Sequence, residues 1–230
     1  MNSGGPRFTL YKWITGLGAA TVQSAVYFAV GHAQFARSTE LLRTRLDDAI
    51  PFLPATAWLY LPFYAAIFAI ALAGFRTRAY FNRALLGFGI ILSVGLVCHR
   101  FIPAVYPRPL LYPPYPDVSY AFMAWVQQID PPGNVFPSLH VAHTSALALI
   151  LHRENRRLGR VVIVMAALLA LSTLTTKQHF VADVVSGLLL AAGTRLLVLR
   201  GVEREAKTGP AGAPVDPGYQ PAVPSDLALE

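Results

Sequence analysis

Residues 49–75 have the sequence AIPFLPATAWLYLPFYAAIFAIALAGF, with no Asp, Glu, Lys or Arg. A helix needs roughly 20 predominantly apolar residues to cross a bilayer, and this stretch exceeds that length. Residues 13–36 form a second uncharged stretch that is also long enough. Both predict transmembrane helices. We interpret the one at residues 13–36 as an uncleaved anchor, because it is longer than the apolar core of a secretory signal.

The composition indicates that lipid surrounds much of the chain. Hydrophobic residues make up 54% of the 230 residues and charged residues only 13%, whereas an average soluble domain carries about 25% charged residues. Four further apolar segments follow, at residues 84–104, 138–152, 161–176 and 180–199. The predicted fold class is therefore all-α: a polytopic membrane helical bundle of about six transmembrane helices.

The basic residues predict how this bundle is oriented. The formal net charge is +7, which in a soluble domain would suggest a nucleic-acid partner. Here most basic residues precede the first span, separate the second from the third and the fourth from the fifth, or follow the sixth: Arg7, Lys12, Arg76, Arg78, Arg83, Arg153, Arg156, Arg157, Arg160, Arg195, Arg200, Arg204 and Lys207. The positive-inside rule then places both termini in the cytoplasm. We predict a multi-pass protein of the plasma (inner) membrane that binds no nucleic acid.

The chain divides into one membrane domain and one tail. Residues 1–202 are predicted to form a six-span catalytic membrane domain. Residues 203–230 are rich in Pro, Gly and Ala and bury too little apolar surface to offset the entropy of ordering, so we predict a disordered cytoplasmic tail. Cys98 is the only cysteine, which excludes an intrachain disulfide and a cysteine metal cluster.

Two connecting segments stand out. Residues 106–136 contain repeated prolines that prevent a long helix, but residues 118–129 predict a short amphipathic helix with aromatic side chains suited to the membrane interface. This segment is interpreted as a lid or a wall for lipid entry. Residues 43–54 are interpreted as a solvated loop that caps the second span. The aromatic residues near that point, among them Tyr60 and Tyr64, are interpreted as packing or interfacial residues.

The first motif that can carry chemistry is Pro137-Ser138-Leu139-His140, which opens the fourth span. Ser138 occupies an N-cap position, where its hydroxyl and the unpaired N–H groups of the first turn can bind an anion. The positive end of the helix dipole favours a phosphate there, and His140 lies two residues further on. The alternative is that Ser138 only caps the helix and His140 only packs.

The second motif is His179-x-x-x-Asp183, at the start of the sixth span. Residues four apart share one helix face, so the Asp183 carboxylate can accept a hydrogen bond from the imidazole N–H of His179. That contact fixes the tautomer and leaves the other ring nitrogen free to attack phosphorus. The spacing alone also occurs by chance.

Both motifs are predicted to lie at one membrane face, because the fourth and sixth spans begin on the same, non-cytoplasmic side. Arg108 and Lys177 are assigned to that side. Two histidines, a carboxylate, a helix N-terminus and two cations are the groups needed to bind a phosphoryl group and stabilise its transition state. The rival chemistry is a metal ion held by His140, His143, His179 and Asp183. We interpret His143 instead as a polar packing residue.

These motifs resemble those of the type 2 phosphatidic acid phosphatase (PAP2) superfamily, membrane lipid phosphatases and phosphotransferases related in core fold to vanadium haloperoxidases. The resemblance covers roughly residues 47–199. The family pattern P-S-G-H has Leu139 at its glycine, and S-R-x5-H-x3-D has Thr173 at its arginine. The pattern K-x6-R-P finds Arg108 and Pro109, with Phe101 at the lysine position and Arg100 one residue earlier.

The P-S-L-H variant and the Thr-Lys-Gln-His run resemble the branch that includes inositol phosphorylceramide synthases. The resemblance implies that His179 is the nucleophile, that Asp183 orients it, and that His140 is the general acid and later the general base. The phosphate oxygens would be bound by Arg108, Lys177, Ser138, Leu139 and Arg100. No metal and no cofactor is implied.

The predicted function is that of a lipid phosphate phosphatase that works through a phosphohistidine at the extracytoplasmic face. Its partners would be membrane lipids, with a phospholipid or a polyprenyl phosphate as substrate. One alternative is a phosphotransferase that moves a phosphoinositol-type headgroup to an acceptor lipid. An alternative from another class is a non-catalytic protein that binds or transports phospholipids.

Overall fold

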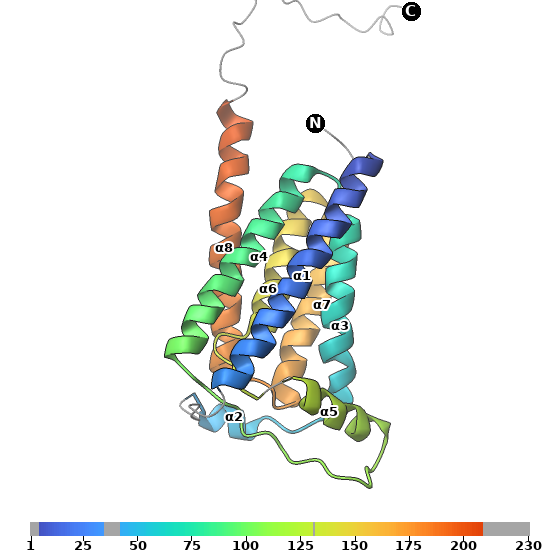
Figure 1. The fold of residues 1–230 in the computed structure, drawn as a ribbon, viewed down its shortest axis with the longest axis vertical. Helices are drawn as coiled ribbons and strands as arrows, with labels where there is room; N and C mark the ends of the chain where they lie inside the picture. The colour runs from blue at the N-terminus through green and yellow to red at the C-terminus, as the bar shows by residue number, and fades with distance from the viewer. Residues whose placement is uncertain (1–4, 35–41, 131, 209–230) are drawn as a thin grey trace, which may run out of the picture.

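The computed structural model describes residues 5–34, 42–130 and 132–208. Its elements are α1 (Pro6–Gln34), α2 (Arg45–Ala49), the 3₁₀ turn η2 (Pro54–Thr56), α3 (Ala57–Gly74), α4 (Arg78–Phe101), α5 (Val118–Ile129), α6 (Leu139–Glu154), α7 (Arg156–Thr175) and α8 (Val181–Thr208). The long helices run alongside one another, while α2 and α5 lie at one end of the bundle (Figure 1). The predicted all-α bundle is confirmed for the part of the chain that the structure describes.

Helix α6 forms the centre of this bundle. It packs against α3, α4, α7 and α8, and most of its residues are buried. The largest apolar cluster joins Ile67 of α3, Leu151 of α6 and Leu169 of α7. Helix α6 has 16 residues and a length of about 24 Å. Because protein rather than lipid surrounds most of it, it does not need the length of a lipid-facing span.

Five helices in the described ranges are long and apolar enough to cross a membrane: Pro6–Val30, Pro54–Gly74, Arg78–Phe101, Arg156–Thr175 and Val181–Arg200. The protein is therefore an integral multi-pass membrane protein. Helix α6 corresponds to the remaining predicted span. Helix α1 begins and α8 ends at the same end of the bundle (Figure 1), as an even number of crossings requires.

Two element boundaries differ from the sequence-based expectation. The uncharged stretch of residues 49–75 begins at Ala49, but α3 begins only at Ala57. Pro51 and Pro54 explain the delay, because proline has no N–H to donate and disfavours helical geometry in the residue before it. At the other end of the chain, residues 203–208 continue α8. The rest of the predicted disordered tail, residues 209–230, lies outside the described residues.

The short amphipathic helix predicted at residues 118–129 is confirmed as α5. Asp117 caps it by accepting the N–H groups of Ser119 and Tyr120 at 2.7 and 3.1 Å. On its inner face, Met123 and Val126 pack with Ala57 and Tyr60 of α3. Helix α5 thereby covers the end of the bundle at which α6 and α8 begin (Figure 1).

Candidate active site

The starts of α6 and α8 are joined directly. The Ser138 hydroxyl caps α6 by accepting the Val141 N–H at 3.4 Å, and the Ser138 N–H donates to the Asp183 carbonyl at 3.1 Å. Gly187 permits this approach, because a Cβ at that position would lie 2.7 Å from the Ser138 carbonyl oxygen. The Ser138 N–H is thus occupied. The N–H groups of the next two residues lie in the first turn of α6, where no earlier helical residue supplies a carbonyl acceptor.

His179 is buried in the turn between α7 and α8. Its Nδ1 lies 3.1 Å from the Val135 carbonyl oxygen and 3.4 Å from Asp183 Oδ2. Both partners are acceptors, so we assign the proton to Nδ1 and the lone pair to Nε2. Asp183 is held in turn by the Phe180 N–H, which donates to Oδ2 at 2.8 Å. The carbonyl of Val135 is the nearer partner of the imidazole, and the sequence motif does not reveal it.

His140 faces His179, with 5.9 Å between the ring centroids. Three tyrosine rings surround His140: those of Tyr27, Tyr60 and Tyr64 lie 6.0, 4.9 and 4.8 Å from it, centroid to centroid. Tyr60 is fully buried and makes hydrogen bonds, so it is not an interfacial residue. The structure therefore brings together His140, His179 and Asp183, as their spacing and shared membrane face predict.

Asp130 joins this cluster although no sequence pattern indicates it. Its Oδ2 accepts the Tyr60 hydroxyl at 2.7 Å, and its Oδ1 accepts the Tyr27 hydroxyl at 2.9 Å. The Tyr60 oxygen also lies 3.2 Å from each ring nitrogen of His140. The one sequence signal is a carboxylate directly before a Pro-Pro pair. That signal does not point to partners in α1 and α3.

Arg108 enters the site as one half of an ion pair. Its Nη1 donates to the Asp130 carbonyl oxygen, and its Nη2 lies 3.7 Å from Asp130 Oδ2. Burial by itself would raise the pKa of the Asp130 carboxyl, but Arg108, His140 and the tyrosine hydroxyls outweigh burial and hold this pKa below its usual value. Asp130 is therefore ionised and offsets the charge that Arg108 brings.

Lys177 binds the backbone that leads into α3. Its own backbone lies in the left-handed region, with φ of 57°, and its Nζ donates to the carbonyl oxygens of Asp47 and Ile50 at 2.8 and 2.5 Å. Burial lowers the pKa of the Lys177 ammonium, while the Asp47 and Asp48 carboxylates act in the opposite direction. The ammonium is thus occupied by two carbonyl groups of residues 47–50.

The interpretation of residues 43–54 as a solvated loop is wrong for Asp47. Its carboxylate is buried, and Oδ1 accepts the Val181 N–H at 2.7 Å. Oδ2 accepts the Thr44 N–H at 2.8 Å, which caps α2. Asp47 therefore satisfies an unpaired N–H at the start of α8, the helix that carries Asp183.

We expect Asp47→Ala to lower the free energy of unfolding by about 1–3 kcal/mol, because it removes a buried carboxylate that accepts the part-buried N–H groups of Thr44 and Val181. Thermal unfolding of the purified protein in detergent measures the effect. Asp48→Ala is the matched control: Asp48 is 55% exposed and pairs with Arg43, which is 51% exposed, and such pairs contribute less than about 1 kcal/mol. Equal destabilisation by the two variants would contradict the capping role of Asp47.

Arg100 lies outside the cluster, although the sequence places it among the phosphate ligands. It is exposed at the end of α4, and its guanidinium carbon lies 5.8 Å from the Phe101 ring centroid. The neighbouring His99 is buried instead. Successive helix residues point about 100° apart, so His99 and Arg100 face different directions.

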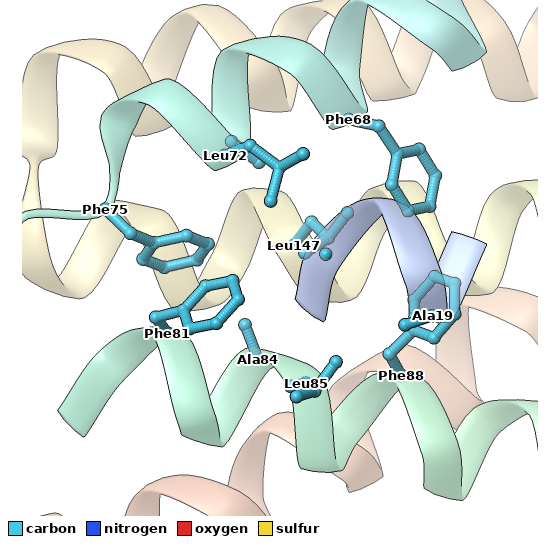
Figure 2. A pocket seen from close by; sticks show the side chains of 11 residues that line it. Ala19, Phe68, Leu72, Phe75, Phe81, Ala84, Leu85, Phe88 and Leu147 are labelled. Carbon is cyan, nitrogen blue, oxygen red and sulfur yellow. The ribbon is translucent and has the colours of Figure 1, made fainter. Parts of the chain in front are cut away.

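Two of the cavities in the described part of the bundle differ in character. One, of about 200 Å³, adjoins His140 and is lined by Gln23, Ser24, Tyr27, Phe28, Leu61, Tyr64, Val126, Ile129, Asp130 and Leu139. The other is a gap of about 30 Å³ between α1, α3, α4 and α6, with an entirely apolar lining that includes Phe68, Phe81 and Phe88 (Figure 2). Of these two, only the first has titratable side chains in its lining, and we name it the His140 cavity.

A protein-family model described as the PAP2 superfamily matches residues 13–197. The chain belongs to the PAP2 superfamily. No curated protein and no solved structure matches it. The family model does not distinguish branches within the superfamily, so the resemblance to inositol phosphorylceramide synthases stays a prediction.

In this PAP2 protein, Leu139 takes the place of the usual glycine because α4 leaves room for it. Leu139 is buried and packs with Ile91 and Ala142. Gly95 of α4 faces it, and a Cβ at Gly95 would lie 2.5 Å from a Leu139 methyl carbon. The leucine side chain therefore belongs to the apolar core, and any contact of Leu139 with phosphate would have to come from its backbone N–H.

Thr173 stands where the PAP2 pattern has arginine, and it serves the turn before α8. Its carbonyl oxygen accepts the N–H groups of Gln178 and His179 at 2.9 and 3.2 Å. Its hydroxyl donates to the Ala170 carbonyl at 2.7 Å. Thr173 thus helps to place His179 but supplies no positive charge, so the site carries less positive charge than the usual PAP2 pattern would give it.

His143 packs in the core of this PAP2 protein, as predicted. Its Nδ1 lies 3.2 Å from Gln23 Nε2 and its Nε2 lies 3.3 Å from the Phe88 carbonyl oxygen. Across residues 5–34, 42–130 and 132–208, no group of three or more His, Cys, Asp or Glu side chains could hold a metal ion. The geometry gives no support to the rival metal site.

Proposed function

We propose that this PAP2 protein is a lipid phosphate phosphatase that forms a phosphohistidine at His179. One observation carries the proposal. The Nδ1 proton of His179 is held between the Val135 carbonyl and the Asp183 carboxylate, while the ring of His140 faces His179 across 5.9 Å. A nucleophile of fixed tautomer beside a second titratable group is the arrangement that two-step phosphoryl transfer needs.

The chemistry follows from these roles. Nε2 of His179 attacks phosphorus, the bond from phosphorus to the ester oxygen breaks, and His140 gives its proton to the leaving alcohol. In the second step His140 takes a proton from water as the water attacks phosphorus, and the bond from phosphorus to Nε2 breaks. Asp183 stabilises the positive charge on the phosphorylated imidazole. Arg108 and the first N–H groups of α6 would bind the phosphate oxygens.

Transfer to an acceptor lipid is the second candidate, and the His140 cavity favours it. The cavity measures about 200 Å³ and is lined mainly by apolar and aromatic side chains beside the proposed base. An acceptor hydroxyl held there would replace water in the second step. The proposed sidedness, with the site on the extracytoplasmic face, rests on the distribution of basic residues.

The test uses the purified full-length protein in detergent with a chelator present. Phosphatidic acid, a polyprenyl diphosphate, and phosphatidylinositol with an acceptor lipid are supplied in separate reactions, and the phosphate is traced. We expect release of inorganic phosphate from phosphatidic acid or the diphosphate, and inhibition by vanadate. Phosphate that appears on the acceptor lipid would identify the transferase instead. Binding without turnover of any substrate would support the non-catalytic alternative.

A further inference from the structure

We propose that Asp130, acting through the Tyr60 hydroxyl, is the positioning carboxylate of His140, so that each histidine of the site has its own aspartate. The inference concerns a residue outside the superfamily motifs and rests on the proposed function for its catalytic meaning. His179 contacts Asp183 directly at 3.4 Å. His140 instead reaches Asp130 through one intervening hydroxyl, with 3.2 Å from His140 to Tyr60 and 2.7 Å from Tyr60 to Asp130.

The direction of these hydrogen bonds follows from counting protons. The Tyr60 hydroxyl has one proton, and Asp130 is ionised, so that proton lies in the bond to Oδ2. The Tyr60 oxygen therefore presents a lone pair to His140, and because it lies 3.2 Å from both ring nitrogens it can accept the N–H of either one. The hydroxyl and the carboxylate together favour the protonated, imidazolium form of His140. The imidazolium is the form that can act as a general acid.

Hydrogen bonds and an ion pair fix the position of the Asp130 carboxylate. Its two carboxylate oxygens accept hydroxyls from different helices, Tyr27 of α1 and Tyr60 of α3, and Arg108 lies against the same residue. The carboxylate is buried, and a buried anion is retained only when hydrogen bonds and a cation compensate for lost hydration. A single carboxylate thus fixes the His140 ring and also keeps the Arg108 guanidinium near the site.

The charge state of His140 depends on all groups that face it. They are Tyr27 from α1, Tyr60 and Tyr64 from α3, His179 from the start of α8, and Asp130 and Arg108 from the segments beside α5. Asp130 is the only anion among them at neutral pH. Its removal therefore destabilises the imidazolium form of His140, and the uncovered charge of Arg108 acts in the same direction.

The test measures protonation of His140 without requiring turnover. His140 is half-buried and lines a cavity, through which diethylpyrocarbonate, a reagent for neutral imidazole, can reach it. The modified peptide is quantified by mass spectrometry across a range of pH in the full-length protein. We expect Asp130→Asn to move the midpoint of His140 modification to lower pH by about one unit, a tenfold loss of proton affinity.

Tyr60→Phe and Tyr64→Phe form a matched pair. Both rings lie against His140 at nearly the same distance, but the Tyr64 hydroxyl accepts from Gln23 Nε2 at 3.0 Å rather than binding Asp130. Tyr60→Phe should lower the midpoint, and Tyr64→Phe should leave it in place. An unchanged midpoint in Tyr60→Phe, or an equal shift in both variants, would overturn the inference. This pair also decides the matter if Asp130→Asn does not fold.

Activity separates this inference from the proposed function. If the wild-type protein turns over a lipid phosphate, Asp130→Asn should move the alkaline limb of its kcat/KM profile to lower pH, since proton donation by His140 then fails earlier. If no lipid phosphate is turned over but the modification midpoint shifts as expected, the positioning role stands and the phosphatase proposal fails. If a lipid phosphate is turned over but the modification midpoint of His140 does not shift, the phosphatase proposal stands and the positioning role of Asp130 fails.

Discussion

The His179→Ala variant should lose at least about 10⁴-fold in turnover of lipid phosphate, because removal of a covalent nucleophile costs this much in comparable two-step enzymes. The same variant should form no acid-labile phosphoenzyme when it is quenched in base during turnover. Phosphate release from labelled phosphatidic acid and retention of label on the protein are the two measurements. Full activity in His179→Ala would exclude the phosphohistidine mechanism.

A matched control is available for this loss. His152 lies in the last turn of α6, at the end away from the site, so His152→Ala should keep its turnover within about twofold. Both variants need the wild-type elution profile in detergent, which shows that the fold is retained. If His152→Ala lost as much activity as His179→Ala, the effect would lie in the fold and not in the nucleophile.

The double contact of His179 explains why Asp183 should matter less than the nucleophile. When a catalytic histidine depends on one carboxylate for its tautomer, loss of that carboxylate costs about 10⁴-fold. Here the Val135 carbonyl holds the same Nδ1 at the shorter distance, 3.1 against 3.4 Å. The tautomer therefore survives without the carboxylate. What Asp183 adds is its charge and its bond to the Phe180 N–H at the start of α8.

The part of the structure that the sequence predicts is the part governed by local rules. Uncharged runs predict the spans because bilayer thickness sets their length, and the positions of His179 and Asp183 predict a contact because residues four apart share a helix face. The same rules misplace the start of α3, where Pro51 and Pro54 interrupt an apolar run. Apolarity indicates burial in lipid but does not by itself indicate helix.

The part that the sequence leaves open depends on contacts between distant segments. Asp130 meets Tyr60 across 70 residues and Tyr27 across 103, and no periodicity connects these positions. Lys177 and Arg108 have suitable charge for a phosphate, yet carbonyl groups and a carboxylate already bind them. Which cation reaches a ligand depends on these competing partners, and only the folded chain shows them.

The site has less free positive charge for two reasons: Thr173 stands where the PAP2 pattern has arginine, and Arg108 is paired with Asp130. Among the described residues of the site, little positive charge is left uncompensated to attract an anion. In the proposed mechanism, proton transfer by His140 would therefore carry a large share of the work of expelling the leaving alcohol. Proton transfer of this kind contributes about 10²- to 10⁴-fold. The loss of turnover caused by removing His140 should therefore depend strongly on the substrate used.

The His140→Ala variant should lose about 10²- to 10⁴-fold with phosphatidic acid, whose alcohol leaves poorly without a proton. With an aryl phosphate such as p-nitrophenyl phosphate, the leaving group needs no proton, so His179 should still become phosphorylated. Water then lacks its base, and the phosphoenzyme should accumulate. A burst of nitrophenol close to one equivalent per protein chain, followed by slow turnover, measures both effects in one trace.

The wild-type protein and the His179→Ala variant are the two controls for this result. The wild type should hydrolyse the aryl phosphate without lasting accumulation of phosphoenzyme, and His179→Ala should give neither burst nor turnover. Mass spectrometry should locate the retained phosphate on His179 in the His140→Ala variant. If His140→Ala lost activity equally with the aryl and the lipid phosphate and gave no burst, His140 would act before phosphoryl transfer, in binding the phosphate and not in moving a proton.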